Sequence, residues 1–474
     1  IIPLANGKLR CHHMLKQATR HAFALLPEAE QRQAFCQFGK WYVQQEDYEE
    51  ALDCLYRGKD FAGLLTAVQE LCDWSMRAEH KAHLFDWLND CPKDILCQYP
   101  QAVLILMRRM FSLNMIKEML QVKGWYITAL EQNTYLTIEE RNNYYGELEI
   151  ILSFLAFNSI TRMSEHHRKA YRLLSCAPQT LSKQGVWSFG APSLLGLYLR
   201  DSGALQQTLE DMYACMPPYY LLSNWHGAGA AELTEAEALL LQGRITLCCD
   251  FLAMQRDMLK GERTEQIEKY RRHEGSAWQQ SMLLNTADMC VGFYYALLGE
   301  TQYLPQWLTS MEFDEAVVLY PARPCRNFIA AQCLLAQQRY TELLVRYDDL
   351  LAECRPYNNF LCQLYLLVQK ACAFAGLGAQ AKAQTALHKA LAMAAPDRLV
   401  LPFAQNSTLL EPLLQKELAG EQRELVERIL ALGEQLAAGR RRLCRTTAER
   451  SLLAELSELE LQIAQLAAAR HTNK

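Results

Sequence analysis

The chain has 474 residues, a net charge of -5 at pH 7 and 50% hydrophobic residues. This length is that of about three globular domains or one long repeat array, and it excludes a single small domain. The apolar content excludes a disordered chain, and the charge balance lacks the basic footprint of a dedicated nucleic-acid-binding protein. The 17 cysteines form no C-x-x-C pair, so we expect free thiols and a cytoplasmic location.

The sequence shows no recognisable pattern of a leader peptide or of a membrane span. The N-terminus lacks the charged and apolar pattern of a secretory signal. The most apolar stretch, 360–377, is interrupted by Gln363, Gln369 and Lys370, so it falls short of the ~20 apolar residues of a membrane helix. We expect no membrane association. Because the chain starts at Ile1 and stops at Lys474 inside a helical pattern, we also expect further segments on both sides.

Apolar residues recur at i, i+3, i+4 and i+7 along almost the whole chain, and glycine and proline are sparse. This periodicity predicts an all-α fold built from helices of about 12 to 18 residues. Short polar or glycine-containing breaks separate the helices and predict an array of helical hairpins. The breaks are 45–47, 299–300, 337–339 and 376–378.

Three of these hairpins share a layout in which small residues stand where two helices would cross. The layout matches the tetratricopeptide pattern, which predicts a degenerate tetratricopeptide-like solenoid. The copies are 32–58 with Gly39, Tyr42, Tyr48, Ala51, Leu55 and Gly58; 326–353 with Ala331, Tyr340, Leu343, Tyr347 and Leu350; and 359–396 with Ala371, Gly378, Ala383, Leu387, Ala390 and Pro396.

The middle of the chain, 183–231, is rich in aromatic residues, glycine and proline, which predicts ordered loops that interrupt the repeats. Aromatic faces beside a few polar groups are typical of sites for small polar ligands. The alternative is that the same rings pack the loops onto neighbouring helices. The candidate ligand-binding residues are Trp187, Phe189, Tyr219, Tyr220, Trp225 and His226.

Motifs for catalysis or metal binding are missing. The chain has no G-x-x-x-x-G-K-[S/T] loop, no G-x-S-x-G elbow and no H-E-x-x-H motif. His80 and His83 have the spacing of one helix face but lack a further ligand set. We therefore predict no catalytic residue, no metal site and no enzymatic activity in this segment.

The C-terminal region combines an expected amphipathic helix, 421–438, with a basic run after Gly439. The run, Arg440, Arg441, Arg442 and Arg445, is interpreted as a solvated face or a linker, with a tether on DNA phosphates as the alternative. A last expected helix covers 456–474.

Several blocks of this sequence resemble the MalT-like LuxR-family transcriptional regulators, which are ATP-dependent. Residues 9–15 and 41–51 are similar to the junction between the ATPase half and the helical-repeat half. Further blocks resemble the sensor region, and 456–474 resembles the first helix of the LuxR-type DNA-binding domain, with Leu459 and Arg470 departing from its pattern. The sensor-like blocks are 187–193, 226–230, 390–397 and 402–404.

The resemblance implies a sensor that binds a small-molecule inducer or a regulatory protein and controls promoter binding by a C-terminal helix-turn-helix. ATP and Mg²⁺ would belong to an upstream domain, promoter DNA would bind only the intact protein, and self-association is an open expectation. The implied DNA-proximal residues are Arg440, Arg441, Arg442, Thr472, Asn473 and Lys474.

The expected organisation has six parts. They are the end of the region following the ATPase half (1–30), N-terminal repeats (31–180), an irregular aromatic-rich sensor segment (181–276), C-terminal tetratricopeptide-like repeats (277–420), a helix with a basic linker (421–450) and the start of a truncated helix-turn-helix (451–474). An alternative function is that of a freestanding adaptor that binds partner proteins through its repeats.

Overall fold

The computed structural model describes residues 2–3, 9–10, 13–71, 78–181, 187–248, 250–251, 277–313 and 318–454. The fold is all-α, with helical hairpins throughout, as predicted. The strands in the described residues are β1 (Ile2–Pro3) and β2 (Leu9–Arg10), which pair antiparallel with Ile2 opposite Arg10. None of the described helices combines the length and apolar character that a membrane span needs.

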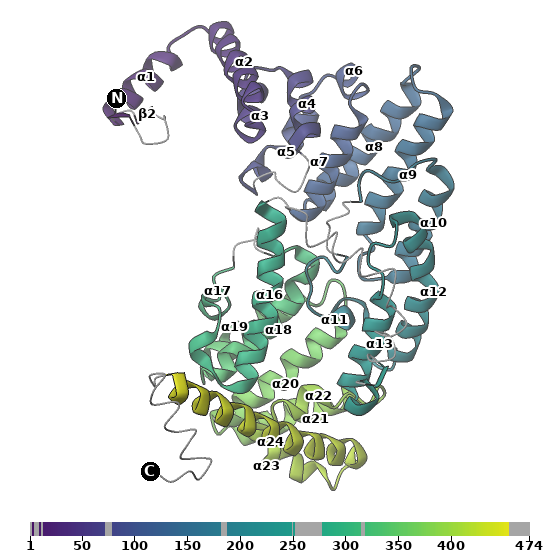
Figure 1. Cartoon of the computed structure of the whole chain (residues 1–474), viewed down its shortest axis with the longest axis vertical. Coiled ribbons are helices and arrows are strands. Elements are labelled where there is room, and N and C mark those ends of the chain that lie inside the picture. The colour runs from purple at the N-terminus through teal and green to yellow at the C-terminus, as the bar shows by residue number, and fades with distance from the viewer. Residues whose placement is uncertain are drawn as a thin grey trace, which may run out of the picture.

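The first part of the chain forms the upper arm of an arc (Figure 1). Its helices are α1 (His13–Ala24), α2 (Glu28–Gln44), α3 (Tyr48–Arg57), α4 (Phe61–Leu71), η2 (Ala78–Ala82), α5 (Leu84–Asn89), α6 (Lys93–Leu96), α7 (Pro100–Ser112), α8 (Ile116–Gln132), α9 (Ile138–Phe154) and α10 (Ile160–Leu173). One hydrophobic core joins α3 to α9. Helix α1 has no buried residue and contacts α2 through the rings of Phe23 and Phe35, 5.2 Å apart.

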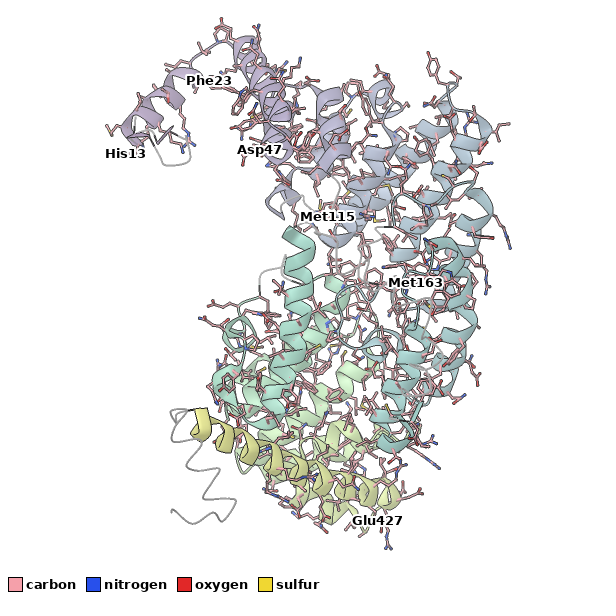
Figure 2. The ribbon with its side chains drawn as sticks, viewed as in Figure 1. His13, Phe23, Asp47, Met115, Met163 and Glu427 are labelled. Atoms are coloured by element: carbon pink, nitrogen blue, oxygen red, sulfur yellow. The ribbon has the colours of Figure 1, made fainter. Side chains whose placement is uncertain are left out.

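The second part forms the lower half of the arc in Figure 1. Its helices are α11 (Leu194–Tyr198), α12 (Leu205–Ser223), α13 (Ala230–Leu241), α16 (Ala277–Leu298), η3 (Thr301–Tyr303), α17 (Gln306–Ser310), η4 (Tyr320–Ala322), α18 (Arg323–Ala336), α19 (Tyr340–Ala352), α20 (Phe360–Gly376), α21 (Gln380–Ala394), α22 (Leu401–Ala404), α23 (Ser407–Glu417) and α24 (Arg423–Ala454). A second core extends through these helices and includes Met163 of α10, which is labelled in Figure 2.

The three predicted repeat copies form the helix pairs α2–α3, α18–α19 and α20–α21. Their small and bulky signature residues lie at the contacts between paired helices: Ala51, Ala371 and Ala383 are fully buried, as are Leu343 and Leu387. The hairpins are therefore confirmed at the predicted breaks. That the pairs continue as one regular solenoid stays a prediction.

One sequence-based expectation is wrong. The run of prolines at 217–218 lies inside α12 rather than in a loop. A helix-interior proline costs about 3 kcal/mol, and here the buried Met216 and Tyr219 anchor the helix on both sides of it. The basic run after Gly439 continues α24, which runs without a break from Arg423 to Ala454. Arg440, Arg441 and Arg442 are exposed on this helix, as the interpretation as a solvated face expects.

Candidate functional site

The end of α12 brings together four of the six predicted aromatic residues. Tyr219 and Tyr220 lie in its last turns, and the chain then reverses through Asn224 and Trp225, whose φ angles are 51° and 67°. This reversal stacks Trp225 on Tyr220, with ring centroids 5.6 Å apart and an interplanar angle of 17°. It also places Nδ1 of His226 2.6 Å from the hydroxyl of Tyr219.

The inner half of this cluster is a buried polar contact between three helices. The ring of Tyr219 lies 4.7 Å from that of His167 in α10, and Nε2 of His167 lies 3.2 Å from Oγ of Ser153 in α9. Burial lowers the pKa of His167 to about 3, with a smaller contribution from the neighbouring His166. His167 is therefore neutral at physiological pH and holds α9, α10 and α12 together.

The outer half of the cluster is open to solvent. Trp225 is 55% exposed and, with Tyr220, forms an aromatic step on the surface. Trp187 packs on the backbone of Gly227, where a Cβ would stand 2.6 Å from Trp187 Cδ1. The ring of Trp187 also lies 5.6 Å from that of Tyr198. Of these residues, Trp225 is the one placed to meet a ligand or partner.

Phe189 lies in a different aromatic cluster. Its ring centroid is 6.0 Å from that of Phe111 and 6.1 Å from those of Phe154 and Phe157. Phe189 packs against both large cores. The structure therefore separates the predicted residues. Tyr220 and Trp225 form a partly exposed stacked pair, Tyr219 and His226 belong to a buried polar contact, and Phe189 packs between the two cores.

The basic residues of the C-terminal region lie along α24. Arg440, Arg441 and Arg442 are exposed on this helix. Arg440 donates a hydrogen bond from Nη1 to the carbonyl of Leu297 at the end of α16, at 3.1 Å. The predicted Thr472, Asn473 and Lys474 lie outside the described residues.

The imidazole of His80 in η2 contacts other protein groups. Nε2 of His80 lies 2.9 Å from a carboxylate oxygen of Glu49, and its ring lies 5.3 Å from that of Trp87. Within the described ranges, no group of three or more His, Cys, Asp or Glu side chains is arranged to hold a metal ion.

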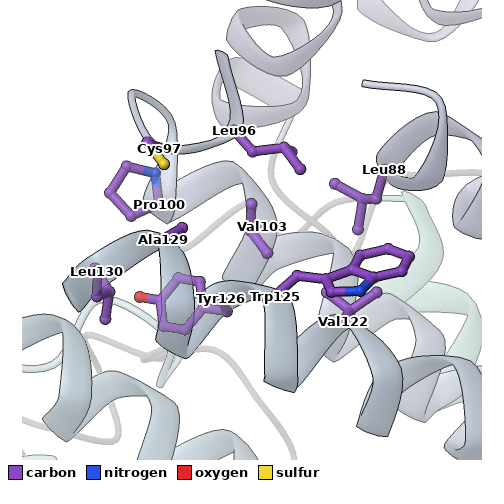
Figure 3. Close-up of a pocket in the computed structure, with 10 residues that line it drawn as sticks. All are labelled: Leu88, Leu96, Cys97, Pro100, Val103, Val122, Trp125, Tyr126, Ala129 and Leu130. Atoms are coloured by element: carbon purple, nitrogen blue, oxygen red, sulfur yellow. The ribbon is translucent and has the colours of Figure 1, made fainter. Parts of the chain in front are cut away.

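A cavity between α5, α6, α7 and α8 was not predicted from the sequence (Figure 3). Its outer chamber has a volume of about 300 Å³, at the lower end of the range for small-molecule sites. The lining residues of this chamber are Leu88, Asn89, Cys91, Lys93, Leu96, Cys97, Trp125, Thr128, Ala129 and Gln132. An inner recess of about 10 Å³ shares its wall and adds Pro100, Val103, Val122, Tyr126 and Leu130.

Tyr126 is one of the residues that line the recess. Its hydroxyl is buried and has no hydrogen-bond partner in the protein, and burial raises the pKa of this phenol well above its usual value. The Trp125–Tyr126 pair on α8 was the available sequence signal, but helical spacing does not distinguish a cavity-lining ring from a core ring.

Comparison with known proteins does not assign the chain. No model of a known protein family matches it, and no curated protein sequence matches it.

Proposed function

We propose that this chain is the sensor and scaffold region of a MalT-like LuxR-family transcriptional regulator. In this proposal it binds an inducer or a regulatory protein and controls DNA binding by a helix-turn-helix that comes after it. The family resemblance motivates the proposal, and the placement of α24 is the observation that supports it best, because α24 leads toward the segment that resembles the DNA-binding domain.

Helix α24 crosses the base of the molecule and contacts two separate parts of the repeats (Figure 1). Its first half is anchored by Val426 and Ile429, which are fully buried. Arg428 donates a hydrogen bond from Nη2 to the carbonyl of Gln242 after α13, at 2.6 Å. Arg440, three turns later, holds the end of α16 through Leu297. A displacement between α13 and α16 would therefore move α24.

This geometry gives a mechanism for signal output. An effector that binds one arrangement of the repeats more tightly than another shifts the population toward that arrangement, by its differential affinity. Because α24 contacts both the α13 and the α16 regions, the shift changes the position or order of the DNA-binding segment attached to the end of α24. Neither hydrolysis nor metal chemistry in this chain is needed for that step.

The test is the coding sequence on both sides of this chain. We expect a P-loop ATPase upstream and the remaining helices of a LuxR-type domain after Lys474. The joined protein should then shift a promoter fragment, whereas residues 1–474 alone should not reach the ~10⁻⁸–10⁻¹¹ M affinities of specific DNA binders. Stop codons at both edges would contradict the proposal and favour the freestanding adaptor.

A further inference from the structure

A groove separates α16 from the segment of η3 and α17 that follows it in the chain, and Figure 1 shows α17 beside α16. Asp288 and Val291 of α16 line one side, and Tyr303, Trp307 and Glu312 line the other. The volume of about 610 Å³ lies within the range of ligand sites. The groove is open to solvent, since Val291 is 43% and Tyr303 55% exposed. A side chain of another protein can therefore enter it.

The groove is preformed because α17 is fixed to its neighbours. A Cβ on Gly292 in α16 would stand 2.7 Å from Leu308 Cδ1 and 3.2 Å from Pro305 Cδ, so the glycine lets α17 lie directly on α16. Arg339, just before α19, donates a hydrogen bond from Nη1 to the carbonyl of Thr309 at 2.6 Å. Little of the binding free energy is then spent on ordering the site.

The groove is negatively charged. Asp288 and Glu312 are its charged lining residues, and among the described residues no lysine, arginine or histidine lines it. Oδ2 of Asp288 accepts a hydrogen bond from Nε1 of Trp307 at 3.0 Å. Within the described part of the chain, neither carboxylate forms an ion pair. Two carboxylates in one groove without a cation beside them attract a positively charged group.

Two aromatic rings lie in the same groove as the carboxylates. The indole of Trp307 is held by Asp288 and packs edge-on with Phe313, at a centroid distance of 6.4 Å. The ring of Tyr303 lies 5.0 Å from that of Tyr295. A guanidinium group suits such a site better than an ammonium group, because it stacks on aromatic faces, is more weakly hydrated and donates two parallel hydrogen bonds to a carboxylate.

We propose that this groove binds an arginine side chain of a partner protein, with the guanidinium against Trp307 and Tyr303 and hydrogen-bonded to the carboxylates of Asp288 and Glu312. That this partner is a regulatory protein rests on the proposed sensor function. Binding itself does not rest on it, since the groove is formed by described residues of this chain.

The test uses two tripeptides with blocked ends that differ only in the charge of the central side chain. One has arginine between two glycines, and the other has citrulline, which has nearly the same shape and is neutral. Their binding to the full chain is titrated by saturation-transfer NMR. We expect the arginine peptide to bind about tenfold more tightly, because hydrogen bonds between charged groups are stronger than neutral ones.

The two carboxylates are tested by isosteric substitution. Asp288→Asn keeps an acceptor for Nε1 of Trp307 and removes the charge, and Glu312→Gln removes the other charge of the groove. Each should weaken binding of the arginine peptide about fivefold and leave the citrulline peptide unaffected. Glu411→Gln makes the same change of net charge at an exposed position on α23, outside the groove, and should leave both affinities unchanged.

A further variant keeps the proposal testable if Asp288→Asn is poorly folded. Gln306 lines the groove and is exposed at the start of α17, so Gln306→Lys should repel the arginine peptide and weaken its binding about tenfold. Equal affinity for the two peptides, an unchanged arginine-peptide affinity in Asp288→Asn or Glu312→Gln, or full binding by Gln306→Lys would overturn the site. Charge-dependent binding in a chain whose gene lacks a helix-turn-helix would support the site and contradict the regulator. No binding in a chain that has one would contradict the site alone.

Discussion

The backbone of Gly39 in α2 lies against Leu55 in α3 so closely that a Cβ on the glycine would stand 2.7 Å from Leu55 Cγ and Cδ2. The same relationship recurs between Gly376 of α20 and Tyr340 of α19, where the nearest ring atom would be 2.5 Å away. In both places the missing side chain lets two helices approach closely. Glycine at these crossings is therefore a requirement of packing, although it weakens the helix itself.

We predict that Gly39→Val lowers the free energy of unfolding by about 2 kcal/mol, because Leu55 is buried and has little room to move. Gly124→Val is the matched control, since a Cβ on Gly124 in α8 meets nothing within 4 Å. This control should change stability by less than about 0.5 kcal/mol. Urea unfolding of both variants checks the prediction, and equal effects would contradict it.

The helical hairpins were predictable from the sequence because their determinants are local. The breaks at 45–47 and 337–339 separate α2 from α3 and α18 from α19 as expected, and the buried alanines follow from helical periodicity. Pro217 and Pro218 gave a wrong prediction because their effect depends on tertiary burial. Gly439 does not end α24, because one glycine costs a helix only about 1 kcal/mol.

The candidate site was predictable only in part. Tyr219 to His226 are close in sequence, so one helix end and one reversal bring them together. Phe189 lies only two residues from Trp187, yet it packs with Phe111 and Phe154, which lie on other helices. Trp125 lines a cavity because of the way four helices meet. The hydrophobic periodicity of the sequence does not distinguish such a ring from one that is packed in the core.

A pH dependence follows from the buried His167. The folded state keeps this imidazole neutral down to about pH 3, whereas the unfolded chain takes up its proton near the ordinary pKa of ~6.5. Its contribution to stability is therefore present above pH 6.5 and is lost as the pH falls from there toward 3. We predict that the stability difference between wild type and His167→Gln narrows by about 1.4 kcal/mol for each pH unit below 6.5. Urea unfolding at pH 7, 6, 5 and 4.5 measures it, and a constant difference would refute the assignment.

The two tryptophans of the candidate site should differ in their effect on stability. Trp187 is wedged between Gly227 and Tyr198, so Trp187→Ala should cost about 2–3 kcal/mol. Trp225 is more than half exposed and contacts chiefly Tyr220, so Trp225→Ala should cost less than about 1 kcal/mol. Thermal and urea unfolding rank the two. The reverse ranking would show that Trp225 is the packing residue and remove it as a candidate for ligand or partner contact.

The contacts of α24 predict how its two ends respond to mutation. Arg440→Ala removes the hydrogen bond to Leu297, while Val426 and Ile429 keep the first half of the helix buried. We therefore expect faster amide hydrogen exchange in the second half of α24 and no measurable change of exchange in its first half. The Tm should not change measurably, because the arginine is exposed and a single surface contact contributes little to stability. Arg441→Ala, one residue away and also exposed, is the control and should leave exchange unchanged along the helix. If both variants accelerate exchange equally, the contact with α16 does not hold α24 in place. A conformational change in the repeats would then reach the proposed DNA-binding segment through the contact of Arg428 with the end of α13.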